Sequence, residues 1–360
     1  MIATQLKVSI LGAGPAGFAL AVDLERKGAS VLLYSHPDHR RHAEAVISRG
    51  GLEVSGAIEA STKLYITSDM QEAVEFSRIV IITVPSTGQE TLLCELERFS
   101  LLEHTLIAVP GNLFSLVATA GLKVRNFLET NISPYSCRMS EGALAVFGKK
   151  GSFSIAALHG DCDLISKAKV ERIFCGQRLR WSHNVIEVSL TNINGVFHPL
   201  MMLMNAGRIE NTGGDFRVYA DGLTRSVANA ILAVDRVRLE IGKAFGFKLD
   251  SVIATSNRCY NARFTDLVDL ARNSEPHNKL MAPGILDHRN LSEDVPDLLV
   301  CWHGLAEKLE INASPIKAVI DLASIATGID YMESGRNMRK LGLQDLSRSQ
   351  LLAQFSVRYP

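Results

Sequence analysis

A glycine-rich turn between an apolar run and a helical pattern constrains the fold of this chain most. Residues 6–11 are apolar, residues 12–17 read Gly-Ala-Gly-Pro-Ala-Gly, residues 18–27 have a helical pattern, and residues 30–34 are apolar again. This order of strand, turn, helix and strand predicts the first unit of a Rossmann-type parallel sheet. There Gly12 makes the tight turn, Gly14 lets the backbone approach a pyrophosphate, and Gly17 lets the helix pack on the strand. We therefore expect a dinucleotide to bind at the start of this helix, on Gly12, Gly14, Pro15, Ala16 and Gly17.

The residues after the second apolar run bear on the choice between NAD and NADP. An NAD-binding unit usually places Asp or Glu at this point to accept the ribose hydroxyls, whereas this chain has Ser35 and His36. Arg40 and Arg41 follow and can pair with a 2′-phosphate. NADP is therefore the favoured cofactor, with NAD possible. In the alternative interpretation the two arginines lie on a solvated face and Asp38 binds the ribose.

Further strands are predicted at 78–84, at 105–109 and just before Thr130. Ligands of an open parallel sheet collect at the carboxyl ends of its strands, so the side chains there are candidates to border the nicotinamide. These candidates are Val84, Pro85, Ser86, Asn112 and Glu129. Residues 143–157, interrupted by 148–151, read as two strands joined by a turn, and 178–181 as one more strand. The sheet is expected to end near His183.

After residue 184 the pattern changes from strands to helices. Apolar residues recur at helical spacing from Val227 to Phe245, and Ser314-Pro315 is a typical start for another helix. A chain of 360 residues is also too long for one ordinary core. The sequence thus predicts an α/β Rossmann domain that binds NAD(P) at 1–184, followed by an all-α substrate domain at 185–360.

The composition excludes several classes of partner. Lys plus Arg balance Asp plus Glu at 38 each, so no long-range field favours nucleic acid or an anionic membrane. No apolar run reaches membrane-spanning length. The six cysteines lie far apart, without the close pairs of metal or redox sites, so no metal is expected. We expect a cytoplasmic protein with reduced thiols that binds small molecules.

Two segments of the second half combine reactive side chains with unusual settings. Residues 192–199 end in His198-Pro199, where proline ends or kinks a helix beside an imidazole. Residues 287–294 form a charged run between helical stretches. A histidine that caps a helix and a solvated loop are the alternative interpretations, and spacing alone does not decide between them.

Several short motifs resemble the opine dehydrogenase family, in particular its octopine synthase group. These motifs are Ile82-Thr-Val-Pro85 with Gly88-Gln89, Leu93-Cys-Glu-Leu96, Ser133-Pro-Tyr-Ser-Cys-Arg138, Thr191-Asn-Ile-Asn194 with His198-Pro199, Asn205-Ala-Gly-Arg-Ile-Glu210, and His288-Arg289 followed by Ser292-Glu-Asp-Val295. The resemblance extends over nearly the whole chain. The His-Pro and Glu-Asp-Val motifs together are more specific than the glycine-rich turn.

The resemblance implies an enzyme that joins an amino acid to a 2-oxo acid and reduces the resulting imine with NAD(P)H. It makes His198 the general acid and base, and gives Asp294 the task of holding its ring. Arg289 is implied to bind the carboxylate of the oxo acid, and Glu129 a cationic amino-acid side chain. Thr130 and Asn194 complete the expected substrate site. Pyruvate and an arginine-like amino acid are the favoured substrates, and 2-oxoglutarate is possible.

Two positions depart from the family pattern, and two other functions stay open. Asn290 replaces a usual aromatic residue beside the oxo-acid site, and Asp221 replaces a usual glutamate. A dehydrogenase of small hydroxy acids, with Lys243 as its catalytic lysine, is one alternative function. The other is a non-catalytic regulator that binds NADP. The oligomeric state is not predicted.

Overall fold

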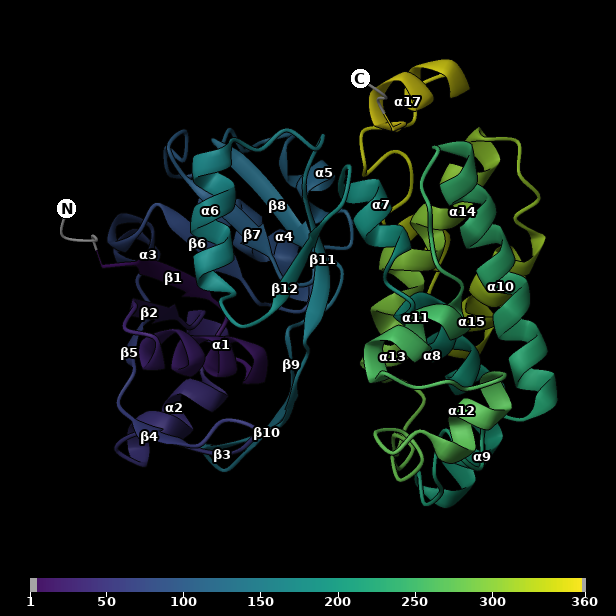
Figure 1. The fold of residues 1–360 in the computed structure, drawn as a ribbon, viewed down its shortest axis with the longest axis horizontal. Helices are drawn as coiled ribbons and strands as arrows, with labels where there is room; N and C mark the ends of the chain where they lie inside the picture. The colour runs from purple at the N-terminus through teal and green to yellow at the C-terminus, as the bar shows by residue number, and fades with distance from the viewer. Residues whose placement is uncertain (1–4, 358–360) are drawn as a thin grey trace. The chain divides into compact units, whose positions relative to one another are not determined.

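The computed structural model describes residues 5–357 and divides into two compact units (Figure 1). The first extends to Val188 and the second begins at Ser189, within the helix α7 (Val185–Leu190). The domain boundary that we predict at 184/185, from the change of sequence pattern there, stays a prediction.

The first unit contains an eight-stranded sheet in the order β12-β11-β8-β7-β6-β1-β2-β5. Six strands, from β8 to β5, run parallel, and β11 pairs with β8 in the antiparallel sense. The strands are β1 (Lys7–Leu11), β2 (Ser30–Tyr34), β5 (Tyr65–Thr67), β6 (Ile79–Ile82), β7 (Thr105–Ala108), β8 (Asn126–Thr130), β11 (Ser152–Ala157) and β12 (Arg178–Trp181). The register aligns Tyr34, Leu11, Ile82, Ala108 and Glu129 in one row. The strand ends predicted to border a ligand therefore share one edge of the sheet.

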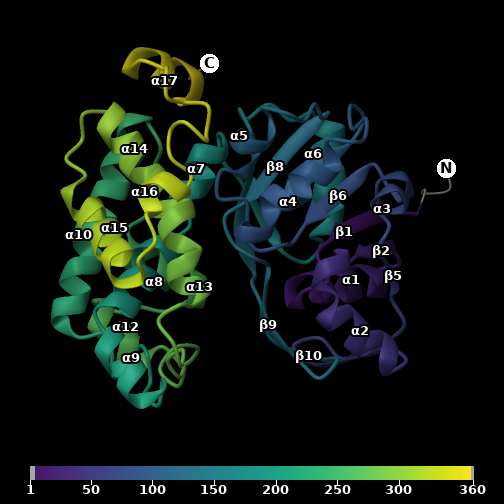
Figure 2. The same cartoon turned by 180° about the vertical axis from the view of Figure 1, so that it is seen from behind.

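Helices cover both faces of this sheet, as the two opposite views show (Figures 1 and 2). On one face α1 (Pro15–Arg26) and α6 (Leu164–Ile173) pack on the inward side chains of the strands. On the other face α3 (Met70–Phe76), α4 (Ser86–Leu96) and α5 (Phe114–Ala118) form a second core. Strands buried on both faces explain why the sequence shows continuous apolar runs rather than alternation.

A second, four-stranded sheet in the order β4-β3-β10-β9 corrects one prediction. Its strands are β3 (Leu52–Gly56), β4 (Ala60–Thr62), β9 (Tyr135–Ser140) and β10 (Ala143–Lys149). The two strands predicted over 143–157 are present as β10 and β11, but they do not pair with each other, because β10 pairs with β9 and β11 joins the large sheet. Glu141 and Gly142 both have positive φ, which suits the two-residue turn between β9 and β10. Residues 148–151 instead lead from one sheet to the other.

The second unit is helical, so an α/β Rossmann-type domain followed by an all-α domain is confirmed. Its helices after α7 are α8 (Asn194–Leu203), α9 (Ala206–Thr212), α10 (Arg225–Ala244), α11 (Val252–Tyr260), α12 (Leu267–Asn273), α13 (Arg289–Ser292), the π-helical η2 (Val295–Leu299), α14 (Val300–Lys308), α15 (Ser314–Thr327), α16 (Tyr331–Ser334) and α17 (Arg348–Phe355). The long helix α10 buries the stripe predicted from Val227 onward. Within residues 5–357, no helix is long and apolar enough to cross a membrane.

Candidate active site

The glycines of the first turn have separate geometric roles. Gly12 has a φ of +128°, and a Cβ built on it lies 2.8 Å from the Thr83 hydroxyl oxygen. A Cβ on Gly17 lies 1.9 Å from the carbonyl oxygen of Gly12, so only glycine lets the helix pack this closely. A Cβ on Gly14 meets no atom of the protein within 4 Å. Gly14 therefore leaves a space at the surface of the loop, which is where a pyrophosphate approaches in such folds.

The N-terminus of α1 is open to an anion. Its N-cap residue is Gly14, so no side chain caps the helix, and Pro15 occupies the first helical position. The backbone N–H groups of Ala16 and Gly17 in the first turn lack intrahelical acceptors. Such groups, together with the helix dipole, favour a phosphate. These residues fit the diphosphate of NAD(P).

Replacing Gly14 with alanine tests this cradle. The added methyl group meets no protein atom, so we expect no change in the melting temperature. It fills the space of the pyrophosphate, so we expect NADPH to bind about tenfold or more weakly. Gly148→Ala is the matched control, because its Cβ also meets nothing within 4 Å. Fluorescence titration with NADPH measures the effect, and equal binding by both variants would contradict this position for the cofactor.

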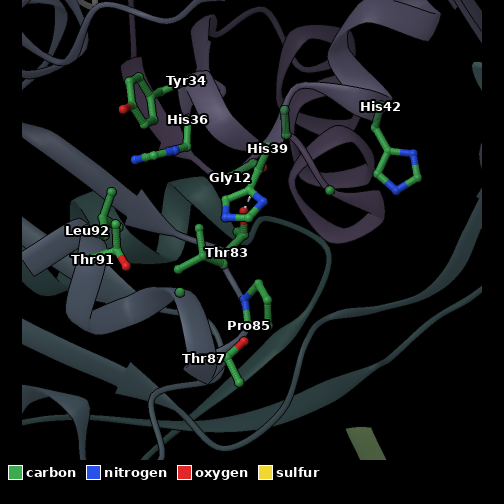
Figure 3. Close-up of a pocket in the computed structure, with 14 residues that line it drawn as sticks. Gly12, Tyr34, His36, His39, His42, Thr83, Pro85, Thr87, Thr91 and Leu92 are labelled. Atoms are coloured by element: carbon green, nitrogen blue, oxygen red, sulfur yellow. Dashed lines mark hydrogen bonds between the residues drawn. The ribbon is translucent and has the colours of Figure 1, made fainter. Parts of the chain in front are cut away.

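A pocket of about 460 Å³ opens beside the glycine loop (Figure 3). Its lining comes from the loop, from the end of β2 with the residues that follow it, and from the segment after β6. The lining residues are Gly12, Ala13, Gly14, Tyr34, His36, His39, His42, Thr83, Val84, Pro85, Thr87, Gly88, Thr91 and Leu92. In Figure 3 His39 lies between His36 and His42, close to Gly12 and Thr83, and Pro85 and Thr87 lie below them in the view. The predicted residues Val84, Pro85 and His36 line this pocket.

Other residues predicted for the cofactor do not line the pocket. Ser35 is buried, and its hydroxyl has no hydrogen-bond partner among the described residues. The Arg40 side chain is 44% exposed and lies 3.6 Å from Glu44. Arg41 is exposed on α2 (Arg41–Ser48), and Asn112 is buried with a φ of +53°. Arg41 thus stands at the surface, and Asn112 inside a tight turn after β7.

Sequence reasoning missed two histidines of the pocket. His39 ends the short helix η1 (Pro37–His39), and His42 lies in the first turn of α2. With His36 they recur every third residue, a spacing that places side chains on one face of successive helical turns. That spacing was the available signal.

The prediction for Glu129 is wrong, because its carboxylate is fully buried. One oxygen accepts a hydrogen bond from Leu113 N at 2.8 Å, and the other from Ser115 N at 2.7 Å and from the Ser115 hydroxyl. The carboxylate thus holds the loop that follows β7. A substrate cation has no access to it. Thr130 is equally buried, and its hydroxyl donates to the carbonyl oxygen of Ile132 at 3.1 Å.

A histidine and an aspartate that are 96 residues apart in sequence meet in the second unit. The Nδ1 atom of His198 lies 2.6 Å from Oδ2 of Asp294. The His198 side chain is 24% exposed and that of Asp294 10%. Because the carboxylate accepts from Nδ1–H, it leaves Nε2 free to exchange a proton, and Nε2 has no hydrogen-bond partner among the described residues.

The helix α8 positions His198 through close packing. The helix continues past Pro199, so the proline does not end it. Pro199 has no N–H to give to Gly195, four residues earlier. A Cβ on Gly195 lies 2.9 Å from the Trp302 ring and 3.1 Å from Leu298, so glycine allows α8 to lie against η2 and α14. Asp294 directly precedes η2, which brings the two partners together.

A chain of aromatic rings adjoins the dyad. The rings of Phe197 and Tyr219 lie 6.1 Å apart, and those of Tyr219 and His277 4.6 Å apart. His277 also accepts or donates hydrogen bonds with Ser274 and Tyr260 at 2.7 and 3.2 Å. Burial and then the charge of His198 lower the pKa of His277 to about 4. His277 is therefore neutral at neutral pH.

The remaining predicted substrate residues lie in the second unit. The Arg289 side chain, at the start of α13, is 69% exposed and lies 3.9 Å from Glu293. Asn194 starts α8, where its N–H donates to Asn192 Oδ1 at 3.2 Å. Asp221 pairs with Arg217, and hydrogen bonds from that arginine lower its pKa to about 2. Asp221, which departs from the family pattern, therefore forms an ion pair with an arginine four residues earlier.

Two family models match this chain. The model for the α-helical domain of NAD/NADP octopine/nopaline dehydrogenase matches residues 181–327. The model for the N-terminus of NAD-dependent glycerol-3-phosphate dehydrogenase matches residues 7–122. The first includes the dyad and Arg289, and the second includes the glycine loop and the pocket.

Relatives with similar sequences extend over almost the whole chain. Protein ocs of Agrobacterium tumefaciens is 28% identical over 344 residues, which are 94% of this chain and 96% of the relative. Vitopine synthase of Allorhizobium ampelinum is 28% identical over 348 residues, with 94% and 95% covered. Opine dehydrogenase of an Arthrobacter species is 29% identical over 357 residues, with 94% and 96% covered.

Solved structures share the fold. Octopine dehydrogenase with NADH and L-arginine superposes with a TM-score of 0.78 at 16% identity, covering 99% of this chain and 100% of the other. Yersinopine dehydrogenase with NADP⁺ superposes with a TM-score of 0.74 at 14% identity, covering 94% and 97%.

Proposed function

We propose that this chain is an NAD(P)-dependent oxidoreductase of the opine dehydrogenase type and that it catalyses the NADPH-dependent reductive condensation of an L-amino acid with a 2-oxo acid. The observation that carries the proposal is the bond between His198 and Asp294, in a helical domain that matches the octopine/nopaline dehydrogenases. A regulator without chemistry has no need of a partly exposed imidazole held by a buried carboxylate.

His198 supplies the proton transfers of this reaction. An amino acid is an ammonium ion at neutral pH, so Nε2 first accepts a proton to free the attacking amine. The carbinolamine then loses water, and His198 returns the proton to the departing hydroxyl. Asp294 holds the ring and offsets the charge that it gains. NAD(P)H supplies the hydride that reduces the imine.

The pocket supports a preference for NADPH. No Asp or Glu is among its lining residues, whereas an NAD enzyme usually offers one to the ribose hydroxyls. A carboxylate at that place would repel a 2′-phosphate. The end of β2 carries Ser35 and His36 instead. The relatives of known structure include complexes with NADH and with NADP⁺.

Pyruvate and an arginine-like amino acid are the proposed substrates. The support comes from octopine dehydrogenase, which is similar in fold and whose structures contain L-arginine, agmatine or pyruvate. Arg289 is exposed, and within residues 5–357 its guanidinium has only the Glu293 carboxylate as an ion-pair partner, 3.9 Å away, so it is available to a substrate carboxylate. Glu129 is excluded from this site by its burial.

Oxidation of NADPH tests the proposal directly. Pyruvate and 2-oxoglutarate are each supplied with and without arginine, glutamine or glutamate, with NADH in parallel. Oxidation that requires both an oxo acid and an amine is expected. Oxidation with an oxo acid alone would instead indicate a simple dehydrogenase, whose proposed lysine, Lys243, is exposed near the end of α10. No oxidation under any condition would refute catalysis.

Arg289→Ala should raise the KM for the oxo acid much more than the KM for the amino acid. A lost charged hydrogen bond costs about 1.5–3 kcal/mol, so we expect the KM for the oxo acid to rise roughly 10- to 100-fold. The KM for the amino acid should change by less than about threefold. Arg272→Ala, at another exposed arginine of the second unit, is the control. Equal effects on both substrates would contradict the carboxylate role.

A further inference from the structure

The ionisable side chains that line the cofactor pocket are three imidazoles and one phenol. Among the fourteen lining residues, these are His36, His39, His42 and Tyr34, and no Lys, Arg, Asp or Glu is present. All three histidines follow β2, where the fold places the adenosine ribose. A 2′-phosphate on this wall would therefore meet imidazoles as the basic groups of the lining.

His36 is already committed to the protein. Its Nδ1 accepts a hydrogen bond from the N–H of Asp38 at 3.1 Å, which requires that nitrogen to be unprotonated. Its Nε2 lies 3.3 Å from a Glu95 oxygen, and the other Glu95 oxygen accepts from the Tyr34 hydroxyl at 2.7 Å. His36 and Tyr34 thus both contact the carboxylate of Glu95. Protonation of the His36 Nδ1 would break the hydrogen bond from Asp38 N that caps η1.

His39 and His42 are not committed in this way. Neither ring has a hydrogen-bond or ion-pair partner among the described residues, although the His39 ring lies 5.5 Å from that of His36. His39 is exposed and His42 is half-buried. Burial, and then the charge of Arg41, lower the pKa of His42. An anion in the pocket would reverse that effect, because it favours the charged imidazole.

We propose that His39 and His42 bind the 2′-phosphate of NADPH as imidazolium ions, so that the preference for NADPH over NADH weakens as the pH rises. The proposal rests on the proposed NADPH dependence. Arg40 and Arg41, on the same segment, keep their charge at every relevant pH and cannot give this dependence. The carboxylates nearby are Asp38, Glu44 on α2 and Glu95 on α4.

The direction of the pH dependence follows from the linkage between proton binding and phosphate binding. The phosphate raises the pKa of each imidazole, so its affinity is largest below the free pKa and is lost as the pH rises through the bound pKa. Ordinary values are about 6.5 for histidine and about 6 for the second phosphate ionisation. If binding raises each pKa by about three quarters of a unit, the affinity falls about tenfold in total between pH 6.5 and 8.5.

Titration calorimetry with 2′,5′-ADP and with 5′-AMP isolates the phosphate, because the two nucleotides differ only there. We expect 2′,5′-ADP to lose about tenfold in affinity from pH 6.5 to 8.5, and 5′-AMP to change by less than about twofold. In H39Q/H42Q, 2′,5′-ADP should bind about tenfold more weakly at pH 6.5 and independently of pH, with 5′-AMP unchanged. His159→Gln, at an exposed histidine outside this pocket, should behave as the unmodified chain.

The outcomes distinguish this proposal from the proposed function. If 2′,5′-ADP binds more tightly than 5′-AMP at every pH with a constant ratio, NADPH preference stands and the histidines are not its source. The proposal would also be overturned if R40Q/R41Q bound 2′,5′-ADP and 5′-AMP equally while H39Q/H42Q still bound 2′,5′-ADP more tightly. If the two nucleotides bind equally at all pH values, both the NADPH preference and the histidine site fail.

Discussion

Replacing His198 with alanine is expected to lower kcat for imine reduction about a hundred- to ten-thousand-fold, the usual contribution of a general acid and base. Asp294 accepts the Nδ1–H of this imidazole at 2.6 Å, which leaves Nε2 to exchange protons with the substrate. The dissociation constant of NADPH should change by less than about twofold, because the glycine loop and the pocket belong to the other unit. Stopped-flow oxidation of NADPH and fluorescence titration measure the two quantities.

Two further variants sharpen this test. Asp294→Asn keeps the shape of the side chain but disturbs the tautomer, so kcat should fall even though His198 remains. His277→Gln removes an imidazole whose pKa is already lowered to about 4, so any inflection of the rate above about pH 5 should persist in it. Turnover of His198→Ala at the original rate would disprove the role of the dyad.

The Rossmann-type half could be predicted from sequence because its signals are local. The glycine loop, the strands at 30–34 and 178–181 and the helix between the first strands depend on turn chemistry and periodicity within short windows. The second sheet could not be predicted in this way. Its strands β3 and β10 pair although about ninety residues separate them, and β3 shows no continuous apolar run.

The candidate site shows the same division between local and distant information. The adjacent Pro199 marks His198 as a candidate in the sequence, but only the family resemblance pairs it with Asp294, which lies on another element. For Glu129 the position at a strand end was predicted well, while its surroundings were not. The backbone N–H groups of Leu113 and Ser115 fold over it, a contact that no local pattern reveals. Likewise, sequence favoured arginines after β2, whereas the pocket wall carries histidines.

A second large effect is expected from Arg238, which is almost fully buried in the helical unit. Its guanidinium donates to Asp235 at 2.6 and 2.8 Å, to the carbonyl oxygen of Leu190 at 2.6 Å and to that of Asp250 at 2.7 Å. The other oxygen of Asp235 accepts from Val252 N at the start of α11. One buried ion pair thus fixes three segments, including the one that leads into α8 and His198.

Arg238→Met should therefore lower the free energy of unfolding of this unit by about 3–5 kcal/mol, because it leaves the Asp235 carboxylate buried and unpaired. Arg236→Met, two residues away and exposed on the same helix, is the matched control and should change it by less than about 0.5 kcal/mol. The chain has two tryptophans, Trp181 in the first unit and the buried Trp302 in the second. In a Trp181→Phe background, urea unfolding followed by fluorescence reports the second unit alone. The double variant D235L/R238M should recover part of the loss, since it buries no single charge. Equal stability of the two arginine variants would show that this buried pair is not what holds the helical unit together.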